Sequence, residues 1–312
     1  MNKTFDYSKN KVKFLLLPLA IIVAGIIMYF VHGGFNFDVE FVGGIRMQVN
    51  VGTDFKNSDV EKLVEDATGL DAIVQEGSSN SVAVIKLPST NDTANDEANK
   101  NKAFDALKKQ YSLNDEALVS AQSADPSFGK EVQGKALSFT LLAILFILVY
   151  IIFRFDWRSG IMAVCTLALN VLVMAAVYTI TNIAINTTFI AAMLTVVGYS
   201  INNTIVIFDR IRENKKLRRR NESITDMTNR SIGETLGRTI NSTITTLITI
   251  VLIYILGVTT IKQFAFPLII GILAGAYSSI FIASTFWAAW KEAEAEAKSQ
   301  AAADRKKTTK NN

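Results

Sequence analysis

A group of amide and hydroxyl side chains interrupts a long apolar stretch of this sequence, at Asn202, Asn203 and Thr204. Hydrocarbon offers no hydrogen-bonding partner, so polar side chains at membrane depth must face other protein segments or water. An amide oxygen can coordinate a hard cation, but an amide cannot take up and release a proton near neutral pH. This composition therefore predicts a polar contact or an ion path inside a helical bundle.

The polar group lies within one of six long apolar runs. Half of the 312 residues are hydrophobic, which is more than an ordinary soluble domain carries. A helix needs about 20 predominantly apolar residues to cross a bilayer, and each run approaches or exceeds that length. We therefore expect a polytopic α-helical membrane protein with six transmembrane helices, over 14–31, 136–153, 160–180, 183–208, 240–257 and 264–287.

Charge in the connecting segments predicts the orientation of these helices, because cytoplasmic loops carry an excess of Lys and Arg. Segment 209–238 holds nine basic and five acidic residues, whereas segment 32–134 holds seventeen acidic and nine basic residues. We expect both termini in the cytoplasm, with an N-terminal segment at 1–13 and a charged tail at 288–312. The basic loop 209–238 is expected to attract anionic lipid, since no motif for nucleic acid accompanies it.

The extracytoplasmic segment 32–134 shows strand and helix patterns in the order βαββαβ, which is the ferredoxin-like plan. Its first strand alternates apolar and polar residues, as a half-buried strand does. The acidic residues of this domain are expected on solvated outer faces. We expect strands over 45–51, 72–75, 82–87 and 117–121, helices over 57–68 and 101–111, and a polar loop over 91–98.

Few residues suit metal or catalytic chemistry. His32 and Cys165 are the single histidine and the single cysteine, so we expect no metal site and no intrachain disulfide. The sequence also lacks a phosphate-binding loop and a nucleophile–base pair. We therefore expect no cofactor and no enzymatic activity.

Several separate motifs resemble those of the SecF family of protein translocase subunits, and the similarity covers almost the whole chain. The stretch Gly198–Glu213 resembles the family's fourth-span signature, and Glu40–Gly44 resembles the Asp-Phe-x-Gly-Gly element after the first span. Tyr150–Phe155, Leu236–Thr246 and Gly271–Ser279 resemble the second, fifth and sixth spans. The resemblance and the small-xxx-small pattern assign motif or helix-packing roles to Gly198, Tyr199, Asp209, Arg210, Arg212, Glu213, Gly271, Gly275, Ser278 and Ser279, and an outer-domain motif role to Glu40, Gly43 and Gly44.

The resemblance implies a role in protein export at the bacterial cytoplasmic membrane. It implies a SecD-like partner within the resistance-nodulation-division superfamily, and association with the SecYEG channel and YajC. It also implies that the pair uses an ion gradient to draw translocating polypeptide outward, after the ATPase SecA has begun the push.

The sequence departs from the family at its titratable positions. Asn203 stands where the family carries an intramembrane Asp, and Leu169–Asn170 stands where many relatives carry a His-Asp pair. None of the six runs contains Asp, Glu, Lys or Arg, while Arg238 matches the family's arginine at the start of the fifth span. Arg238 is expected to extend to the cytoplasmic face or to pair with another subunit. The ion-path candidates are Asn203, Arg238, Asn170, Asn202 and Thr204.

These departures leave three hypotheses for energy coupling. The proton-carrying carboxylate belongs to the SecD-like partner, or the pair runs on sodium, or this subunit has lost ion coupling and acts as a scaffold. We favour the first. Two other readings stay open for the whole chain: a half-transporter for a small lipophile, and a membrane scaffold whose outer domain recruits a partner.

Overall fold

The computed structural model describes residues 6–77, 80–90, 92–124, 126–218 and 222–310, which divide into two compact units. The larger unit comprises Met1–Gly34, Thr140–Asn182 and Ala191–Asn312. The smaller unit comprises Phe35–Phe139 and Ile183–Ile190. Each unit is described by itself below.

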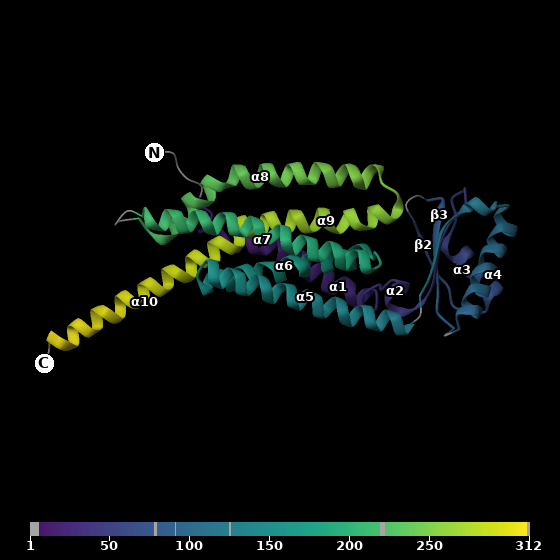
Figure 1. The fold of residues 1–312 in the computed structure, drawn as a ribbon, viewed down its shortest axis with the longest axis horizontal. Helices are drawn as coiled ribbons and strands as arrows, with labels where there is room; N and C mark the ends of the chain where they lie inside the picture. The colour runs from purple at the N-terminus through teal and green to yellow at the C-terminus, as the bar shows by residue number, and fades with distance from the viewer. Residues whose placement is uncertain (1–5, 78–79, 91, 125, 219–221, 311–312) are drawn as a thin grey trace. The chain divides into compact units, whose positions relative to one another are not determined.

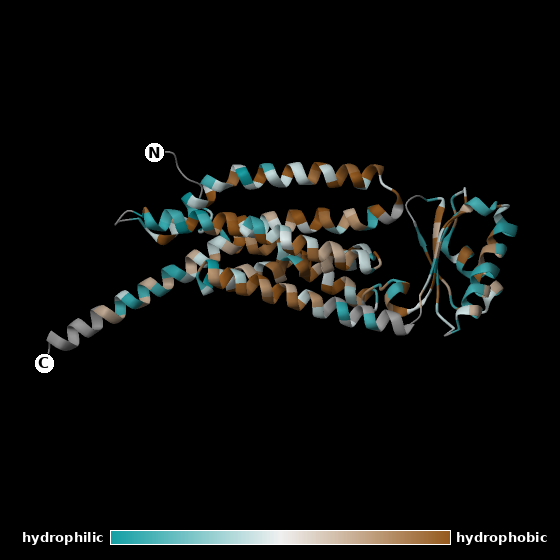
Figure 2. Cartoon of the chain, viewed as in Figure 1, coloured by the Kyte–Doolittle hydropathy of each residue, from teal (hydrophilic) through white to brown (hydrophobic). Residues whose placement is uncertain are grey.

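The larger unit is a set of long helices that contain long apolar stretches, whereas the C-terminal helix Ser284–Lys310 is mostly hydrophilic (Figures 1 and 2). Among the described residues, five helices are long and apolar enough to cross a membrane, and Ser138–Arg154 is a shorter apolar helix within α5. The shorter helix covers most of the expected span 136–153. The helices of the unit are α1 (Lys11–Val31), α5 (Pro126–Arg154), α6 (Trp157–Thr181), α7 (Thr187–Lys216), α8 (Ile224–Leu256), α9 (Thr259–Ser278) and α10 (Ser284–Lys310), with α5 and α7 each beginning in the smaller unit.

Most of the expected loop 209–238 is helical. Helix α7 continues to Lys216, and α8 begins at Ile224, well before the expected fifth span. The Ser223 Oγ caps α8 by accepting from the Asp226 backbone N–H, which satisfies a donor at the helix start. The hydropathy pattern marks where a helix enters hydrocarbon, and these helices extend beyond that point. Arg219 and Arg220 of the basic run lie outside the described residues.

A π-helical turn, η2 (Ser279–Ala283), joins α9 to α10. Such turns shift the hydrogen-bonding register of a helix by one residue and occur frequently at functional sites. The Ser284 hydroxyl donates to the Ile280 carbonyl at 3.1 Å, next to the turn. The expected sixth span, 264–287, therefore consists of α9, the π-turn and the start of α10.

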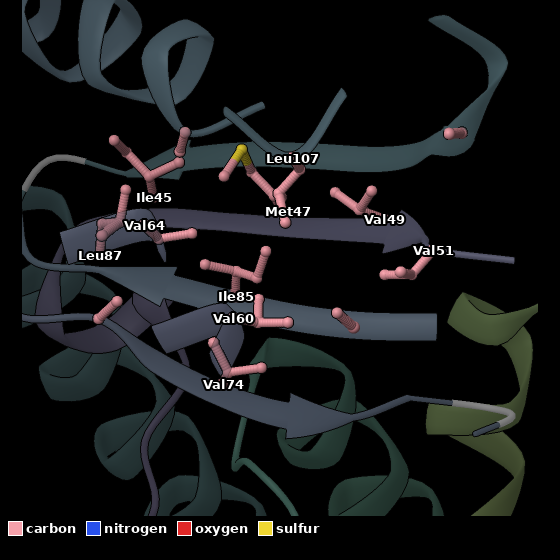
Figure 3. Close-up of a cluster of buried hydrophobic side chains, with 14 residues drawn as sticks. Ile45, Met47, Val49, Val51, Val60, Val64, Val74, Ile85, Leu87 and Leu107 are labelled. Atoms are coloured by element: carbon pink, nitrogen blue, oxygen red, sulfur yellow. The ribbon is translucent and has the colours of Figure 1, made fainter. Parts of the chain in front are cut away.

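The smaller unit contains an antiparallel sheet with the strand order β2-β3-β1-β4. Helices α3 and α4 cover one face of the sheet (Figure 1). The side chains of Ile45, Met47 and Ile85 are fully buried between this face and the helices (Figure 3). The elements in chain order are α2 (Val39–Val42), β1 (Gly44–Asn50), α3 (Asn57–Thr68), β2 (Ile73–Glu76), β3 (Val82–Leu87), α4 (Thr93–Tyr111), η1 (Asp115–Ala117) and β4 (Leu118–Ala124).

Three sequence predictions for this unit were wrong. Strand β1 is buried on both faces and not on one, because it is a central strand and Asp38 bonds to Arg46 on its second face. Helix α4 begins at Thr93, capped by Asp92, and replaces most of the loop expected over 91–98. Acidic residues are not all solvated, since Asp38 and Asp96 are 0% and 3% exposed. Residues 78–79 and 91 lie outside the described residues.

Candidate functional site

Ser200 is the centre of a buried polar cluster that joins three elements of the larger unit. The Asn170 Nδ2 of α6 donates to the Ser200 Oγ at 2.7 Å. One turn along α7, the Thr204 Oγ1 shares a hydrogen bond of 2.8 Å with the Ser279 Oγ of η2, and the Ser279 Oγ also reaches the Ser200 carbonyl. All four residues are at most 2% exposed. Hydroxyl and amide groups therefore replace apolar packing at this crossing of α6, α7 and η2.

Two glycines of α9 allow α7 to come this close. A Cβ added at Gly275 would lie 2.9 Å from the Ser200 Cβ, and one at Gly271 would lie 2.3 Å from the Val196 Cγ2. Small residues in this arrangement let helix backbones approach in a membrane, as the spacing predicted. Gly198 differs, because a Cβ there would meet nothing within 4 Å. Gly198 therefore makes no close helix contact within the described part of the chain, and its predicted packing role stays a prediction.

Asn203 is buried beside this cluster but is not bonded to it. The side chain is 3% exposed, and its Nδ2 has no hydrogen-bond partner among the described residues. The Thr239 Oγ1 of α8 is also buried without a partner there. Tyr199 reaches across to α8, with its Oη at 3.5 Å from the Thr243 Oγ1. Asn202 points away and is exposed.

Arg238 lies exposed on α8. Within the described part of the chain it forms no ion pair, and no hydrogen bond joins it to Asn203. Of the five ion-path candidates, the structure therefore links Asn170 and Thr204 through Ser200, buries Asn203 next to Thr204 along α7, and leaves Asn202 and Arg238 on exposed surface.

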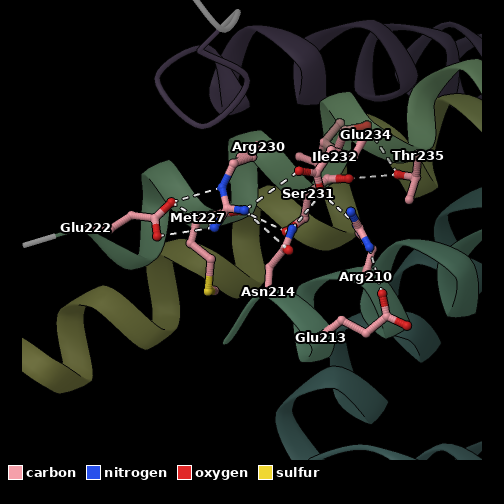
Figure 4. A network of polar contacts seen from close by, with 10 residues as sticks. All are labelled: Arg210, Glu213, Asn214, Glu222, Met227, Arg230, Ser231, Ile232, Glu234 and Thr235. Carbon is pink, nitrogen blue, oxygen red and sulfur yellow. Dashed lines mark hydrogen bonds and ion pairs between the residues drawn. The ribbon is translucent and has the colours of Figure 1, made fainter. Parts of the chain in front are cut away.

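The charged end of the Gly198–Glu213 motif ties α7 to α8 (Figure 4). The Arg210 Nε donates to the Glu234 Oε2 at 2.6 Å, and the Asn214 Nδ2 donates to the same oxygen at 2.7 Å. Arg210 also pairs with Glu213 one turn along α7. Asp209 pairs instead with Arg154 of α5 and Arg212. These motif residues hold helix ends together rather than facing the polar cluster.

The outer-domain motif fixes the first turn of α7. The Glu40 Oε2 accepts from both the backbone N–H and the hydroxyl of Thr187, at 2.9 and 2.6 Å. A carboxylate in this position satisfies free N–H groups and interacts favourably with the positive end of the helix dipole. Gly44 has φ of +122°, and a Cβ there would lie 2.2 Å from the Leu87 carbonyl oxygen, so only glycine fits. Gly43 has φ of +82° and ends α2.

A buried ion cluster next to this motif was missed by sequence reasoning. Asp38 is 0% exposed and pairs with Arg46 at 3.1 Å, and it lies 3.9 Å from the Lys86 Nζ. Arg46 and Lys86 are cross-strand partners on β1 and β3. Burial lowers the pKa of Lys86, Asp38 opposes this shift, and the Arg46 charge adds to it. The available signal was a charged residue within each of the two central strands, Arg46 in β1 and Lys86 in β3.

Sequence reasoning also missed a hydrogen bond from another helix to the carbonyl that a proline leaves without its helical donor. Pro18 lies inside α1 and has no N–H, so the Phe14 carbonyl four residues earlier loses its helical donor. The Tyr277 hydroxyl of α9 donates to this carbonyl at 2.8 Å. An unsatisfied carbonyl in hydrocarbon is costly, and the tyrosine therefore couples α1 to α9 at the proline.

Replacing Tyr277 with phenylalanine is expected to destabilise the chain by about 1 kcal/mol, the scale of interhelical hydrogen bonds in membranes. In a Pro18→Ala background, residue 18 regains its N–H and bonds to Phe14, so the same replacement should cost much less. Equilibrium unfolding in detergent, followed by tryptophan fluorescence, gives the double-mutant cycle. Equal losses in the two backgrounds would contradict the pairing.

The sequence is similar to known protein-export membrane proteins. The family model described as "Protein export membrane protein SecD/SecF, C-terminal" matches residues 103–293. Protein translocase subunit SecF of Alicyclobacillus acidocaldarius is 33% identical over 299 residues, covering 93% of this chain and 94% of that relative. Protein translocase subunit SecDF of Thermus thermophilus is 31% identical over 282 residues, covering 88% of this chain.

A solved structure agrees with the sequence comparison. The crystal structure of SecDF, a translocon-associated membrane protein from Thermus thermophilus, matches with a TM-score of 0.81 and 29% identity over 93% of this chain. This chain spans 39% of that structure's chain and 37% of the SecDF relative.

The helices and the buried polar cluster define a multi-pass membrane protein with polar contacts inside its helical unit. The chain belongs to the SecD/SecF family of protein export membrane proteins. Members of this family named among its relatives are translocase subunits and not enzymes, in agreement with the sequence prediction.

Proposed function

We propose that this chain is a SecF-type subunit of the Sec protein-export machinery in the bacterial cytoplasmic membrane. It pairs with a SecD-like subunit and promotes late translocation of polypeptide, driven by an ion gradient. The existence of relatives named SecDF, in which this chain matches 37–38% of the length, supports a SecD-like partner. SecYEG, YajC and SecA are the further partners that the family resemblance implies.

The proposed architecture has six transmembrane helices and a ferredoxin-like outer domain, with both termini in the cytoplasm. The chain order β1-α3-β2-β3-α4-β4 with sheet order β2-β3-β1-β4 supports the ferredoxin-like plan. The apolar part of α5, over Ser138–Arg154, supports a sixth span. The basic residues near the ends of α7 and α8 support a cytoplasmic location of that connection.

The observation that carries the functional proposal is the polar cluster around Ser200 and the buried amide of Asn203. Polar side chains inside membrane helices mark ion pathways or interhelical contacts. The hydroxyls here are already bonded to one another, whereas the Asn203 Nδ2 and the Thr239 Oγ1 are buried without a described partner. Both groups can donate a hydrogen bond to a carboxylate of the partner subunit, since an amide NH2 is a donor and a hydroxyl can donate or accept. On this proposal Asn203 shapes an ion path and the SecD-like partner carries the proton.

Substituting Asn203 with Asp tests this assignment, because it restores a titratable group at one buried position. Burial disfavours the charged form of a carboxyl, so a proton would then be exchanged there at physiological pH. Translocation into inverted membrane vesicles is measured at acidic and at alkaline pH. We expect the ratio of the two rates to differ at least several-fold between Asn203→Asp and wild type. The matched control is Asn202→Asp, one residue away on exposed surface, which should leave the profile unchanged. Identical profiles for wild type and Asn203→Asp would remove Asn203 from the path.

A second candidate function is a membrane scaffold without ion coupling, and the amide at position 203 favours it. Collapsing the proton gradient and the sodium gradient separately during translocation distinguishes the candidates. Loss with the proton gradient supports a partner carboxylate, and loss with the sodium gradient supports sodium coupling. Indifference to both gradients would leave only the scaffold.

A further inference from the structure

A basic pocket of about 220 Å³ lies where helices α5, α6, α7 and α10 of the larger unit meet. Sites for whole drug-sized molecules have volumes of about 300–1,000 Å³, so this pocket suits a headgroup rather than a complete ligand. Arg154, Arg212 and Lys215 line the pocket. The side chains of Arg154 and Arg212 are 39% and 41% exposed, and Lys215 is exposed as well. A ligand can therefore reach all three cations from outside the protein.

The two arginines of the pocket are held in place and retain N–H donors for a ligand. The Asp209 Oδ1 faces both guanidiniums, at 3.4 Å from the Arg154 Nη2 and 3.1 Å from the Arg212 Nη2. The Arg212 Nη1 also donates to the Arg154 carbonyl at 3.3 Å. A guanidinium has five N–H donors, and these contacts use at most two on each arginine. Both guanidiniums also lie over the Phe155 ring, at 5.5 and 5.6 Å from its centroid, which fixes their positions further.

The pocket carries more positive than negative charge. The carboxylate in its lining, Asp156, is already paired with the Lys291 Nζ at 2.7 Å. Asp209 is shared between the two arginines, and Lys215 forms no ion pair within the described part of the chain. The charged lining residues and their ion-pair partners therefore comprise four cations and two carboxylates, a net charge of +2. This excess favours an anionic ligand.

The remaining wall and the depth of the pocket indicate which anion it takes. Phe208, Ile211 and Trp287 line it beside the cations, and each is at most 4% exposed. The apolar helix Ser138–Arg154 ends at Arg154 itself, so the pocket lies where the hydrocarbon gives way to lipid headgroups. A free phosphate ion has no apolar part to place against this wall, whereas a phospholipid has one next to its phosphate. Charge, wall and depth together favour an anionic phospholipid.

We propose that this pocket binds the headgroup of an anionic phospholipid, for which phosphatidylglycerol is a suitable probe. The lipid phosphate accepts from Arg154, Arg212 and Lys215, and the glycerol end of the acyl chains lies against Phe208 and Ile211. Basic pockets between membrane helices are known to bind anionic headgroups. The sequence predicted only a general attraction of segment 209–238 to anionic lipid, whereas the pocket assigns one defined site. This inference rests on the membrane location of the helices and not on the proposed role in export.

The test compares photoactivatable phosphatidylglycerol with the matching phosphatidylcholine, each with its reactive group at the glycerol end of one acyl chain. The full chain is labelled in lipid nanodiscs, and the adducts are mapped by mass spectrometry. We expect adducts near Phe155, Phe208 and Ile211. Labelling by phosphatidylglycerol should exceed that by phosphatidylcholine at least about fivefold, the effect of about 1 kcal/mol from one basic residue near the membrane surface. Equal labelling by the two probes, or adducts confined to other segments, would overturn the proposal.

A pair of variants separates the pocket from a general attraction of basic residues to anionic lipid. Lys215→Gln removes an exposed charge that pairs with no described residue, so the fold should be retained while labelling by phosphatidylglycerol falls about fivefold. The matched control is Lys216→Gln, the same change at the adjacent exposed residue, which does not line the pocket and should have a much smaller effect. Equal losses in the two variants would assign the labelling to the basic segment as a whole and contradict the pocket.

Inorganic phosphate, added at constant ionic strength, distinguishes a lipid headgroup from a soluble anion. It should leave labelling by phosphatidylglycerol unchanged, because it makes no contact with the apolar wall. Displacement of the probe by millimolar phosphate would identify a soluble anion as the occupant and overturn the assignment to lipid.

Discussion

Replacing Asp38 with asparagine is expected to lower the stability of the smaller unit by about 3–5 kcal/mol, the cost of breaking a buried ion pair by removing one partner. The carboxylate is 0% exposed, caps the N-terminus of α2 through Val39, and is the anion facing Arg46 and Lys86. Without it, both cations remain buried without charge compensation. Strands β1 and β3, which carry these cations, should therefore open more often.

Hydrogen exchange of β1 and β3 in the full chain, corrected for intrinsic rates, measures this loss. The matched control is Asp66→Asn, the same chemical change on the exposed surface of α3. The loss should be smaller at about pH 9 than at about pH 7. Burial already lowers the pKa of Lys86, and losing Asp38 lowers it further. As the pH rises, the folded state therefore releases the Lys86 proton before the unfolded state does, and the buried charge is removed. A loss that matches the Asp66→Asn control would show that the cluster contributes no stability.

Replacing Gly25 with alanine is expected to destabilise the larger unit by about 2–3 kcal/mol, the upper part of the range for overpacking. A Cβ at Gly25 would lie 2.6 Å from the Ala176 Cα and 2.5 Å from its Cβ. Backbone atoms cannot rotate away, so α1 and α6 must separate.

The matched control is Gly198→Ala, because a Cβ at this helical position meets nothing within 4 Å. Alanine is favoured over glycine in a helix by about 1 kcal/mol, so this variant should be slightly more stable than wild type. Gly25→Ala is therefore expected to lower the free energy of unfolding, and Gly198→Ala to raise it. Trp157, Trp287 and Trp290 all lie in the larger unit and report its unfolding in detergent. Stabilisation by both substitutions would show that α1 and α6 are not closely packed at Gly25.

Much of the local structure was predictable because it depends on properties of short segments. Hydropathy located the apolar part of each long helix, and the pattern over Val82–Leu87 predicted β3 with the same bounds. The start of α4 was misplaced, because the polar residues after Asp92 lack an apolar face although Asp92 caps the helix. Polarity alone did not distinguish a solvated helix from a loop.

The candidate site was predictable only as a set of residue types. The composition of α7 indicated polar contacts, and the spacing of Gly271 and Gly275 indicated close helix packing. Which atoms meet was not predictable, since Thr204 and Ser279 are 75 residues apart along the chain. The sequence also offered no reason to separate Asn203, which is buried, from its exposed neighbour Asn202.

The sequence by itself determined that this is a membrane protein of the SecD/SecF family, and the motif resemblance predicted an amide at Asn203 where the family carries an Asp. Hydropathy, charge bias and motif order are local properties, so they can be read without knowing the fold. Only the tertiary structure showed that Ser200 is the centre of the polar cluster, that Tyr277 satisfies the carbonyl freed by Pro18, and that Asp38 is buried with two cations. Each of these depends on packing between segments distant in sequence, because a hydrogen bond or an ion pair is decided by which side chains the packed helices and strands bring within about 3–4 Å.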